Sequence, residues 1–114
     1  MSKMIAMAMP VATDKFEQWK SFTNKLNNEF KAEFKKSRDN VGVHERTFLQ
    51  QIHDMNLVIV TLEGDDPMGS FIKMANTNDE FTKWFLGQVK DVHGVDISQP
   101  MPGPMPELIV DSWS

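Results

Sequence analysis

The run Leu57-Val58-Ile59-Val60-Thr61-Leu62 decides how this sequence folds. Its residues are apolar or β-branched at successive positions, so the run predicts a strand that is buried on both faces. Before it, residues 43–53 mix polar and apolar side chains on both faces, which is typical of an edge strand. The short connection His53-Asp54-Met55-Asn56 predicts a hairpin that joins the two strands.

Residues 3–11 predict another strand with two apolar faces, because both alternating sets of side chains are apolar. Aromatic and aliphatic residues then recur at intervals of three and four. This spacing predicts one long amphipathic helix that ends at about Ser37. Thr13 or Asp14 can cap its start, with Glu17 three residues after Asp14 as in a capping box. The residues that carry the pattern are Phe16, Trp19, Phe22, Leu26, Phe30 and Phe34.

The second half of the chain predicts a helical region in two pieces. Asp66-Pro67 places a capping residue before a proline at the first helical position, and Thr77-Asn78-Asp79-Glu80 forms a second capping box. Gly94 is a natural stop for the second piece. Beyond it, Met101-Pro102-Gly103-Pro104 suits a type II turn, and the alternation in Glu107–Trp113 predicts a last strand.

The element order is therefore β-α-β-β-α-β, an α+β fold of ferredoxin-like topology in a single domain, residues 1–114. The usual sheet order for this arrangement, 4-1-3-2, puts the two doubly apolar strands in the centre of a four-stranded antiparallel sheet. The helices cover only one sheet face. We therefore expect a homodimer that packs sheet against sheet into an α/β barrel, where the abundant methionines fill irregular gaps.

Composition narrows the class of protein. Twelve basic and sixteen acidic residues give a net charge of −4, which disfavours nucleic-acid binding. The local basic cluster Lys31, Lys35, Lys36 and Arg38 is interpreted as a solvated helix end. No run approaches the roughly 18 apolar residues of a membrane span, and the chain has no cysteine. We expect no membrane partner and a cytoplasmic location.

Four segments resemble a small uncharacterised bacterial family within the dimeric α/β-barrel superfamily. They are Val41-Gly42-Val43-His44-Glu45, Phe81-Thr82-Lys83-Trp84-Phe85, His93-Gly94-Val95-Asp96-Ile97-Ser98 and Pro102-Gly103-Pro104-Met105-Pro106-Glu107. That superfamily includes cofactor-free antibiotic-biosynthesis-type monooxygenases, haem-degrading monooxygenases and stress-responsive proteins without known chemistry. The resemblance implies the fold and the dimer, but no particular reaction.

In the enzymes of that superfamily the substrate lies between the helices and the sheet of each subunit. The resemblance thus makes Trp19, Phe22, Trp84 and Phe85 the candidate walls of a substrate cavity. No cofactor is predicted. The haem-degrading members' Asn, Trp and His set has no counterpart that spacing identifies in this sequence, which leaves haem as the weaker alternative.

His44 and Arg46 are the candidate catalytic residues, since both lie on one face of the predicted edge strand. His44 is suited to act as a general base near neutral pH, and Arg46 to hold an anionic substrate. The competing interpretation is a solvated edge, or an ion pair across the dimer. His93 is interpreted as a cation at a helix end. No metal site is predicted, and the nucleophile-elbow, phosphate-loop and Rossmann motifs are absent.

Three functional hypotheses follow. The first is a homodimeric small-molecule-binding protein whose helix–sheet cavity takes a small apolar or anionic ligand. The second is a cofactor-independent monooxygenase or isomerase that acts on a small organic substrate through His44 and Arg46. The third is a structural or protein-interaction module, for which we expect an exposed apolar patch beyond the dimer interface.

Overall fold

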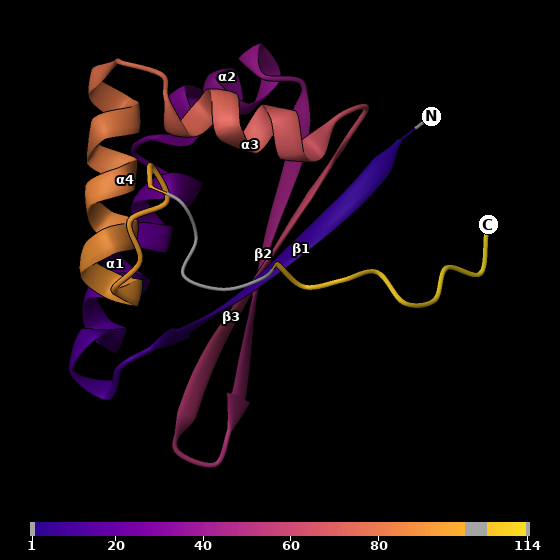
Figure 1. The fold of residues 1–114 in the computed structure, drawn as a ribbon. Helices are drawn as coiled ribbons and strands as arrows, with labels where there is room; N and C mark the ends of the chain where they lie inside the picture. Colours follow the sequence, from indigo (N-terminus) through magenta and orange to yellow (C-terminus); the bar gives the residue numbers. More distant parts are fainter. Residues whose placement is uncertain (1, 100–104, 114) are drawn as a thin grey trace.

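The computed structural model describes residues 2–99 and 105–113, and it shows an α+β protein (Figure 1). Its strands are β1 (Lys3–Val11), β2 (Val43–Ile52) and β3 (Met55–Gly64). Its helices are α1 (Phe16–Asn27), α2 (Lys31–Asn40), α3 (Pro67–Ala75) and α4 (Glu80–His93), with a short 3-10 helix, η1 (Thr13–Lys15), before α1.

The sheet is antiparallel and has the order β1-β3-β2. The continuous apolar run thus occupies the central strand, as its sequence predicts, and β2 is an edge strand. The hairpin between β2 and β3 turns at His53, whose positive φ of 53° suits a tight turn. Met7 and Thr47 both lie opposite Val60 on β3, and this register places all three side chains on the same sheet face.

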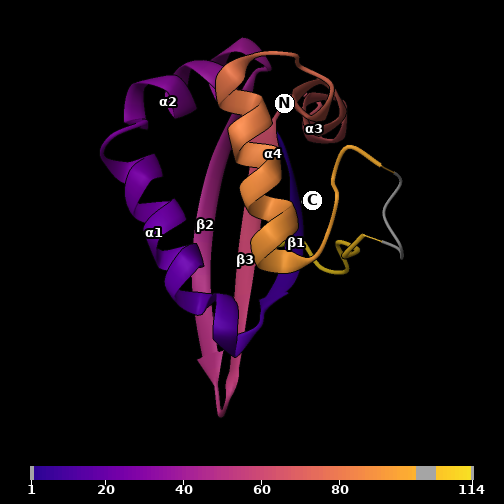
Figure 2. The same ribbon diagram turned by 90° about the vertical axis from the view of Figure 1, so that its left-hand side faces the viewer.

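All four helices lie on one side of the sheet (Figures 1 and 2). Between the two layers is one hydrophobic core, to which α1, α3, α4 and all three strands contribute. The opposite side of the sheet has no covering layer within the described residues. We call it the open face, and its apolar residues are Met4, Ala6, Ala8, Phe48, Ile52, Met55, Leu57 and Ile59.

The prediction of one long first helix was wrong. The chain bends between α1 and α2, where Asn28 adopts a non-helical conformation and its side-chain amide donates to the Asn24 carbonyl. Asparagine favours such local bonds over a continuing helix. No side chain caps the start of α1, so the predicted capping role of Asp14 is not realised. The bend keeps Phe30 and Phe34 in contact with Phe81 on α4.

The two pieces of the second helical region are confirmed. Asp66 caps α3 by accepting a hydrogen bond from the Gly69 amide, with Pro67 at the first helical position. The cap of α4 is Asp79, which accepts from the Thr82 amide at 2.7 Å, and not Thr77 as predicted. Gly94 ends α4 in the left-handed conformation, with φ of 69°, which glycine adopts without strain.

The predicted four-stranded sheet was wrong for the part of the chain that the structure describes, where the sheet has three strands. Glu107–Trp113 does not pair with it. This segment leaves the body on the side of the sheet opposite to α1 and α4 (Figure 1), so β1 becomes an edge strand instead of a central one. The predicted turn at Met101–Pro104 lies outside the described residues. None of the described helices is long and apolar enough to cross a membrane.

Candidate functional site

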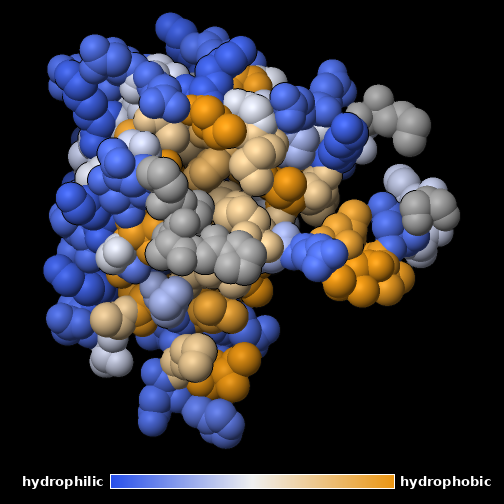
Figure 3. Space-filling view, in the orientation of Figure 1, coloured by the Kyte–Doolittle hydropathy of each residue, from blue (hydrophilic) through white to orange (hydrophobic). Residues whose placement is uncertain are grey.

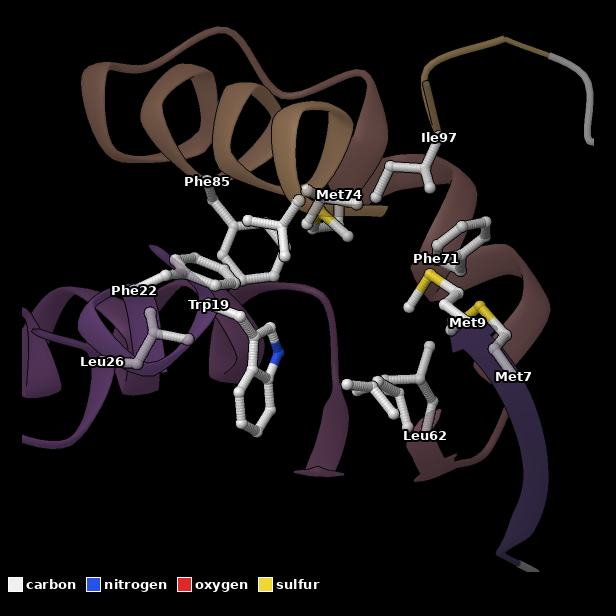
Figure 4. Packing of buried hydrophobic residues seen from close by; sticks show 14 of the residues in the cluster. Met7, Met9, Trp19, Phe22, Leu26, Leu62, Phe71, Met74, Phe85 and Ile97 are labelled. Carbon is white, nitrogen blue, oxygen red and sulfur yellow. The ribbon is translucent and has the colours of Figure 1, made fainter. Parts of the chain in front are cut away.

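A small cavity lies between the helix layer and the sheet, with a volume of about 50 Å³. That is room for about four water molecules, or a ligand of similar size. Figure 4 shows the side chains of α1, α4 and the strands that converge there. Its apolar lining is Met7, Met9, Trp19, Phe22, Leu26, Val58, Val60, Leu62, Phe71, Met74, Phe85, Val89 and Ile97, and its polar lining is Thr23, Glu45, Thr47 and His93.

Three of the four predicted wall residues line this cavity: Trp19, Phe22 and Phe85. Phe22 and Phe85 face each other across α1 and α4, with ring centroids 5.4 Å apart. Trp84 does not line the cavity. It lies on the flank of α4 that faces α1, where it packs on Phe30 at 4.6 Å and on Phe22 at 5.5 Å, because consecutive residues of a helix face different directions.

The polar end of the site contains an ion pair that the sequence analysis did not find. Arg38 Nε of α2 lies 2.7 Å from Glu45 Oε1 of β2, and only 5% and 8% of the two side chains are exposed. The guanidinium lies over two rings that stack on each other, 4.8 Å from the Phe34 centroid and 4.5 Å from the Phe85 centroid. The interpretation of Arg38 as part of a solvated basic cluster was therefore wrong.

Two hydrogen bonds hold Arg38 in place, to Glu45 and to Ser37 Oγ. Its Nη2 atom is buried and has no hydrogen-bond partner among the described residues. A buried carboxylate beside a fixed cation is close to electrically neutral as a pair. The cavity wall at Glu45 therefore presents a compensated charge and not an isolated anion.

His93 brings a titratable ring to the same cavity from the last turn of α4. Its Nδ1 lies 3.0 Å from the Pro10 carbonyl of β1. A carbonyl only accepts, so Nδ1 carries the proton in this bond and the neutral ring keeps a lone pair at Nε2. Burial lowers the pKa of His93 below 6.5, against the smaller opposing effect of the Pro10 bond. The ring thus ties α4 to β1, rather than acting as a cation on its own helix end as predicted.

His44 and Arg46 lie together on the open face, on the side of β2 away from the cavity, with one residue between them in the strand. His44 is exposed, and Arg46 Nη1 lies 3.1 Å from Glu63 Oε1 of β3. The structure thus brings the two predicted catalytic residues to a common surface, but not to the residues that line the cavity. Their neighbours Glu45 and Thr47 face the cavity instead, because side chains alternate along a strand.

No group of three or more potential metal-ligating side chains occurs in residues 2–99 and 105–113. A comparison of the chain with family models, curated proteins and solved structures finds no match. The site therefore has to be interpreted from its own geometry.

Proposed function

We propose that this protein is a homodimer that binds a small molecule in the helix–sheet cavity of each subunit. The observation that carries the proposal is the cavity itself, a mostly apolar space with four polar groups at its wall. Binding sites for small molecules commonly combine an apolar lining with a few polar groups that orient the ligand.

The lining defines the chemistry of the ligand. Its volume of about 50 Å³ suits about four or five non-hydrogen atoms. The Thr47 hydroxyl can donate to or accept from a ligand oxygen, whereas the Thr23 hydroxyl, which donates within α1, and Nε2 of His93 can accept from a ligand hydroxyl. Because Arg38 already compensates Glu45, we propose a neutral ligand with a short apolar chain and one hydroxyl or carbonyl group.

The open face supports the dimer. Phe48, Ile52 and Met55 are about half exposed there, and large contiguous apolar patches on a protein surface mark sites of association. The sheet order β1-β3-β2 also agrees with three of the four strands of a ferredoxin-like sheet. In the proposed dimer the open faces of two copies pack together, as the resemblance to dimeric α/β barrels implies.

The binding proposal is tested by titrating the protein with butan-1-ol, butyrate and butylammonium while amide chemical shifts are recorded. These probes share a chain length and differ in charge, so they separate cavity filling from electrostatics. We expect saturable shifts at α1, α4 and β3 with butan-1-ol and weaker effects with the two ions. The proposal would be contradicted if none of the three probes gave saturable shifts, or if the shifts occurred only on the open face.

Two valine substitutions supply a matched control. Val60 lines the cavity, whereas Val43 is equally buried but lies outside the lining. Val60→Ile adds one methyl group to the cavity and should weaken the binding of butan-1-ol. Val43→Ile adds the same group elsewhere in the core and should leave binding unchanged.

A second candidate function is the cofactor-independent monooxygenase or isomerase, with His93 in the role of general base that the sequence analysis assigned to His44. The specific observation is the Nδ1–Pro10 hydrogen bond, which leaves Nε2 of a neutral imidazole able to accept a proton. The test is hydrogen–deuterium exchange into butan-2-one in deuterated buffer. A rate above buffer that His93→Gln abolishes and His53→Gln preserves would support this candidate, and a rate equal to buffer would exclude it for this ketone.

A further inference from the structure

Beyond Met105, which packs against the core, the last described residues form an exposed apolar arm, which we call the C-terminal arm (residues 106–113). Leu108, Ile109, Val110 and Trp113 are 68%, 77%, 82% and 96% exposed. Figure 3 shows the strongly hydrophobic side chains of this arm well apart from the body of the molecule. Four large apolar side chains in one segment are an unusual surface for a chain that has no partner.

The outer edge of β1 is the second unsatisfied feature. β1 pairs with β3 along one edge only, so its other edge presents backbone N–H and C=O groups without a neighbouring strand among the described residues. An edge of this kind is a template for another extended segment. Pro10 offers no N–H to such a neighbour, which leaves the seven residues Lys3–Met9.

The C-terminal arm matches this edge in length and pattern. After Pro106, which also lacks an N–H, it offers the seven residues Glu107–Trp113. Leu108 and Val110 lie on one side of an extended chain, and Ile109 and Trp113 on the other. A segment with apolar residues on both sides suits a strand that is covered on both faces.

We propose that the C-terminal arm of each copy pairs with the outer edge of β1 in a second copy, so that two chains exchange their fourth strands. This inference rests on the homodimer of the proposed function and specifies how its two copies are joined. The contact is reciprocal, as a two-fold symmetric dimer requires: each copy gives one arm and receives one.

The direction of the arm favours a second copy over the arm's own β1. The arm runs away from its own sheet, on the side of the open face, which is the side where a partner sheet would lie (Figure 1). Pairing with its own β1 would require the arm to turn back toward that strand (Figure 1). Pairing with β1 of a second copy requires no such turn.

The exchanged arms would also enlarge the interface of the proposed dimer. Two strands of ten residues and one of nine cover a flat footprint of about 33 by 14 Å, or roughly 950 Å² for two faces together. A stable dimer typically buries about 1,200–2,000 Å² in total. Side chains that project from the sheet bury more accessible area than this flat footprint, and two exchanged arms would add the exposed apolar area of residues 108–113 to the interface.

Proline substitutions test whether the arm pairs as a strand. Neighbouring residues of a strand direct their N–H groups to opposite edges, so only one of Ile109 and Val110 donates to β1. We expect one of Ile109→Pro and Val110→Pro to weaken the dimer about tenfold or more and the other to have a much smaller effect. Equal dissociation constants for the two variants in analytical ultracentrifugation would contradict strand pairing.

Cross-linking identifies which copy the arm contacts. The chain has no cysteine, so each introduced cysteine is unique. A tagged full-length chain with Ala8→Cys on β1 is co-expressed with an untagged chain with Ile109→Cys on the arm, and the mixture is treated with a short bismaleimide. The matched control replaces Ala8→Cys by Lys83→Cys, an exposed position on α4. A chain that carries both Ala8→Cys and Ile109→Cys reports contact within one copy.

The expected result is a covalent pair of one tagged and one untagged chain with Ala8→Cys and none with Lys83→Cys. A link only within the doubly substituted chain would show that the arm folds onto its own β1 and would overturn the exchange. A dimer in native mass spectrometry with neither link would also overturn it, while the sheet-to-sheet dimer would stand. A monomer in native mass spectrometry would contradict both the strand exchange and the proposed dimer.

Discussion

Arg38 on α2 and Glu45 on β2 form a buried ion pair, with Nε and Oε1 only 2.7 Å apart. The pair joins the helix layer to the edge strand at the wall of the cavity. Its guanidinium stacks on Phe85, whose ring also lines the cavity. Any change in this pair should therefore affect both the stability of the fold and the shape of the site.

Removal of one partner should be strongly destabilising, because it leaves the other charge buried without compensation. We expect Arg38→Met and Glu45→Leu each to lower the free energy of unfolding by about 3–5 kcal/mol. The double variant should lose much less stability than the sum of the losses in the two single variants, because apolar groups then replace both charges and neither is left unpaired. Urea unfolding followed by circular dichroism measures all three, and additive losses would contradict a coupled pair.

The Arg46–Glu63 pair provides the control. It joins the same two chemical groups at 3.1 Å, but 43% and 35% of its side chains are exposed. Solvent screens such pairs, so Arg46→Met should cost about 0–1 kcal/mol. A loss as large as that of Arg38→Met would show that burial is not what distinguishes the two pairs.

Filling the cavity should stabilise the protein. Val60→Ile places one methyl group in unoccupied space, and we expect the free energy of unfolding to rise by about 0.8 kcal/mol. Val43→Ile adds the same group to a buried position outside the cavity lining and should instead cost about 1–3 kcal/mol. Thermal and urea unfolding of the two variants check this difference, and equal losses would indicate that the cavity is too small to accept a methyl group.

The stability should fall when His93 is forced to take up a proton. Its pKa is lower in the folded protein than 6.5 because burial disfavours the charged ring. Below about pH 6.5 the unfolded chain therefore binds more protons than the folded one, and acidification favours unfolding until the folded pKa is passed. Urea unfolding between pH 8 and pH 5 should show a steeper loss for the wild type than for His93→Gln.

His44→Gln removes the same kind of ring from an exposed position and serves as the control. If His93→Gln and His44→Gln changed the pH profile equally, the effect could not be assigned to the buried ring.

The start of α4 offers a test of local structure. Asp79 accepts a hydrogen bond from the Thr82 amide at 2.7 Å, and this backbone bond is the main cause that lowers the Asp79 pKa below 3.8. Asp79→Ala should cost about 1 kcal/mol at pH 7, whereas Asp79→Asn should cost less because asparagine also caps. The stabilising effect of the charge is present above pH 3.8 and is lost as the pH falls through the lowered pKa. Thr77→Ala should change the free energy of unfolding by no more than about 0.5 kcal/mol. A larger loss of stability would indicate that Thr77 is the cap.

The sequence predicted the elements whose pattern is strong and local. The apolar run 57–62, the Asp66-Pro67 start of α3 and the Gly94 stop of α4 each have one physical explanation, and the structure confirms them. The break between α1 and α2 was missed, since the spacing of Phe16 to Phe34 continues across Asn28 and hides the bend. The prediction of a last strand in the sheet was wrong because an alternating pattern indicates an extended chain but does not determine which strand it pairs with.

The site was predictable in its aromatic wall and not in its polar groups. The resemblance to dimeric α/β barrels implied Trp19, Phe22 and Phe85 as wall residues, and all three line the cavity between the helices and the sheet. Glu45 and Thr47 were passed over because the choice of sheet face depends on where the helices pack. Arg38 looks like its solvated neighbours in the sequence, and only the contact between α2 and β2 shows that it is buried.

Native mass spectrometry of the untagged full-length chain is the most direct test of the proposed dimer, in which a second copy covers the open face and the C-terminal arm. We expect, at micromolar concentration, a species of twice the 13.1 kDa chain mass, which butan-1-ol loads with up to two molecules. A monomer at the same concentration would contradict the dimer, and with it the strand exchange that rests on it.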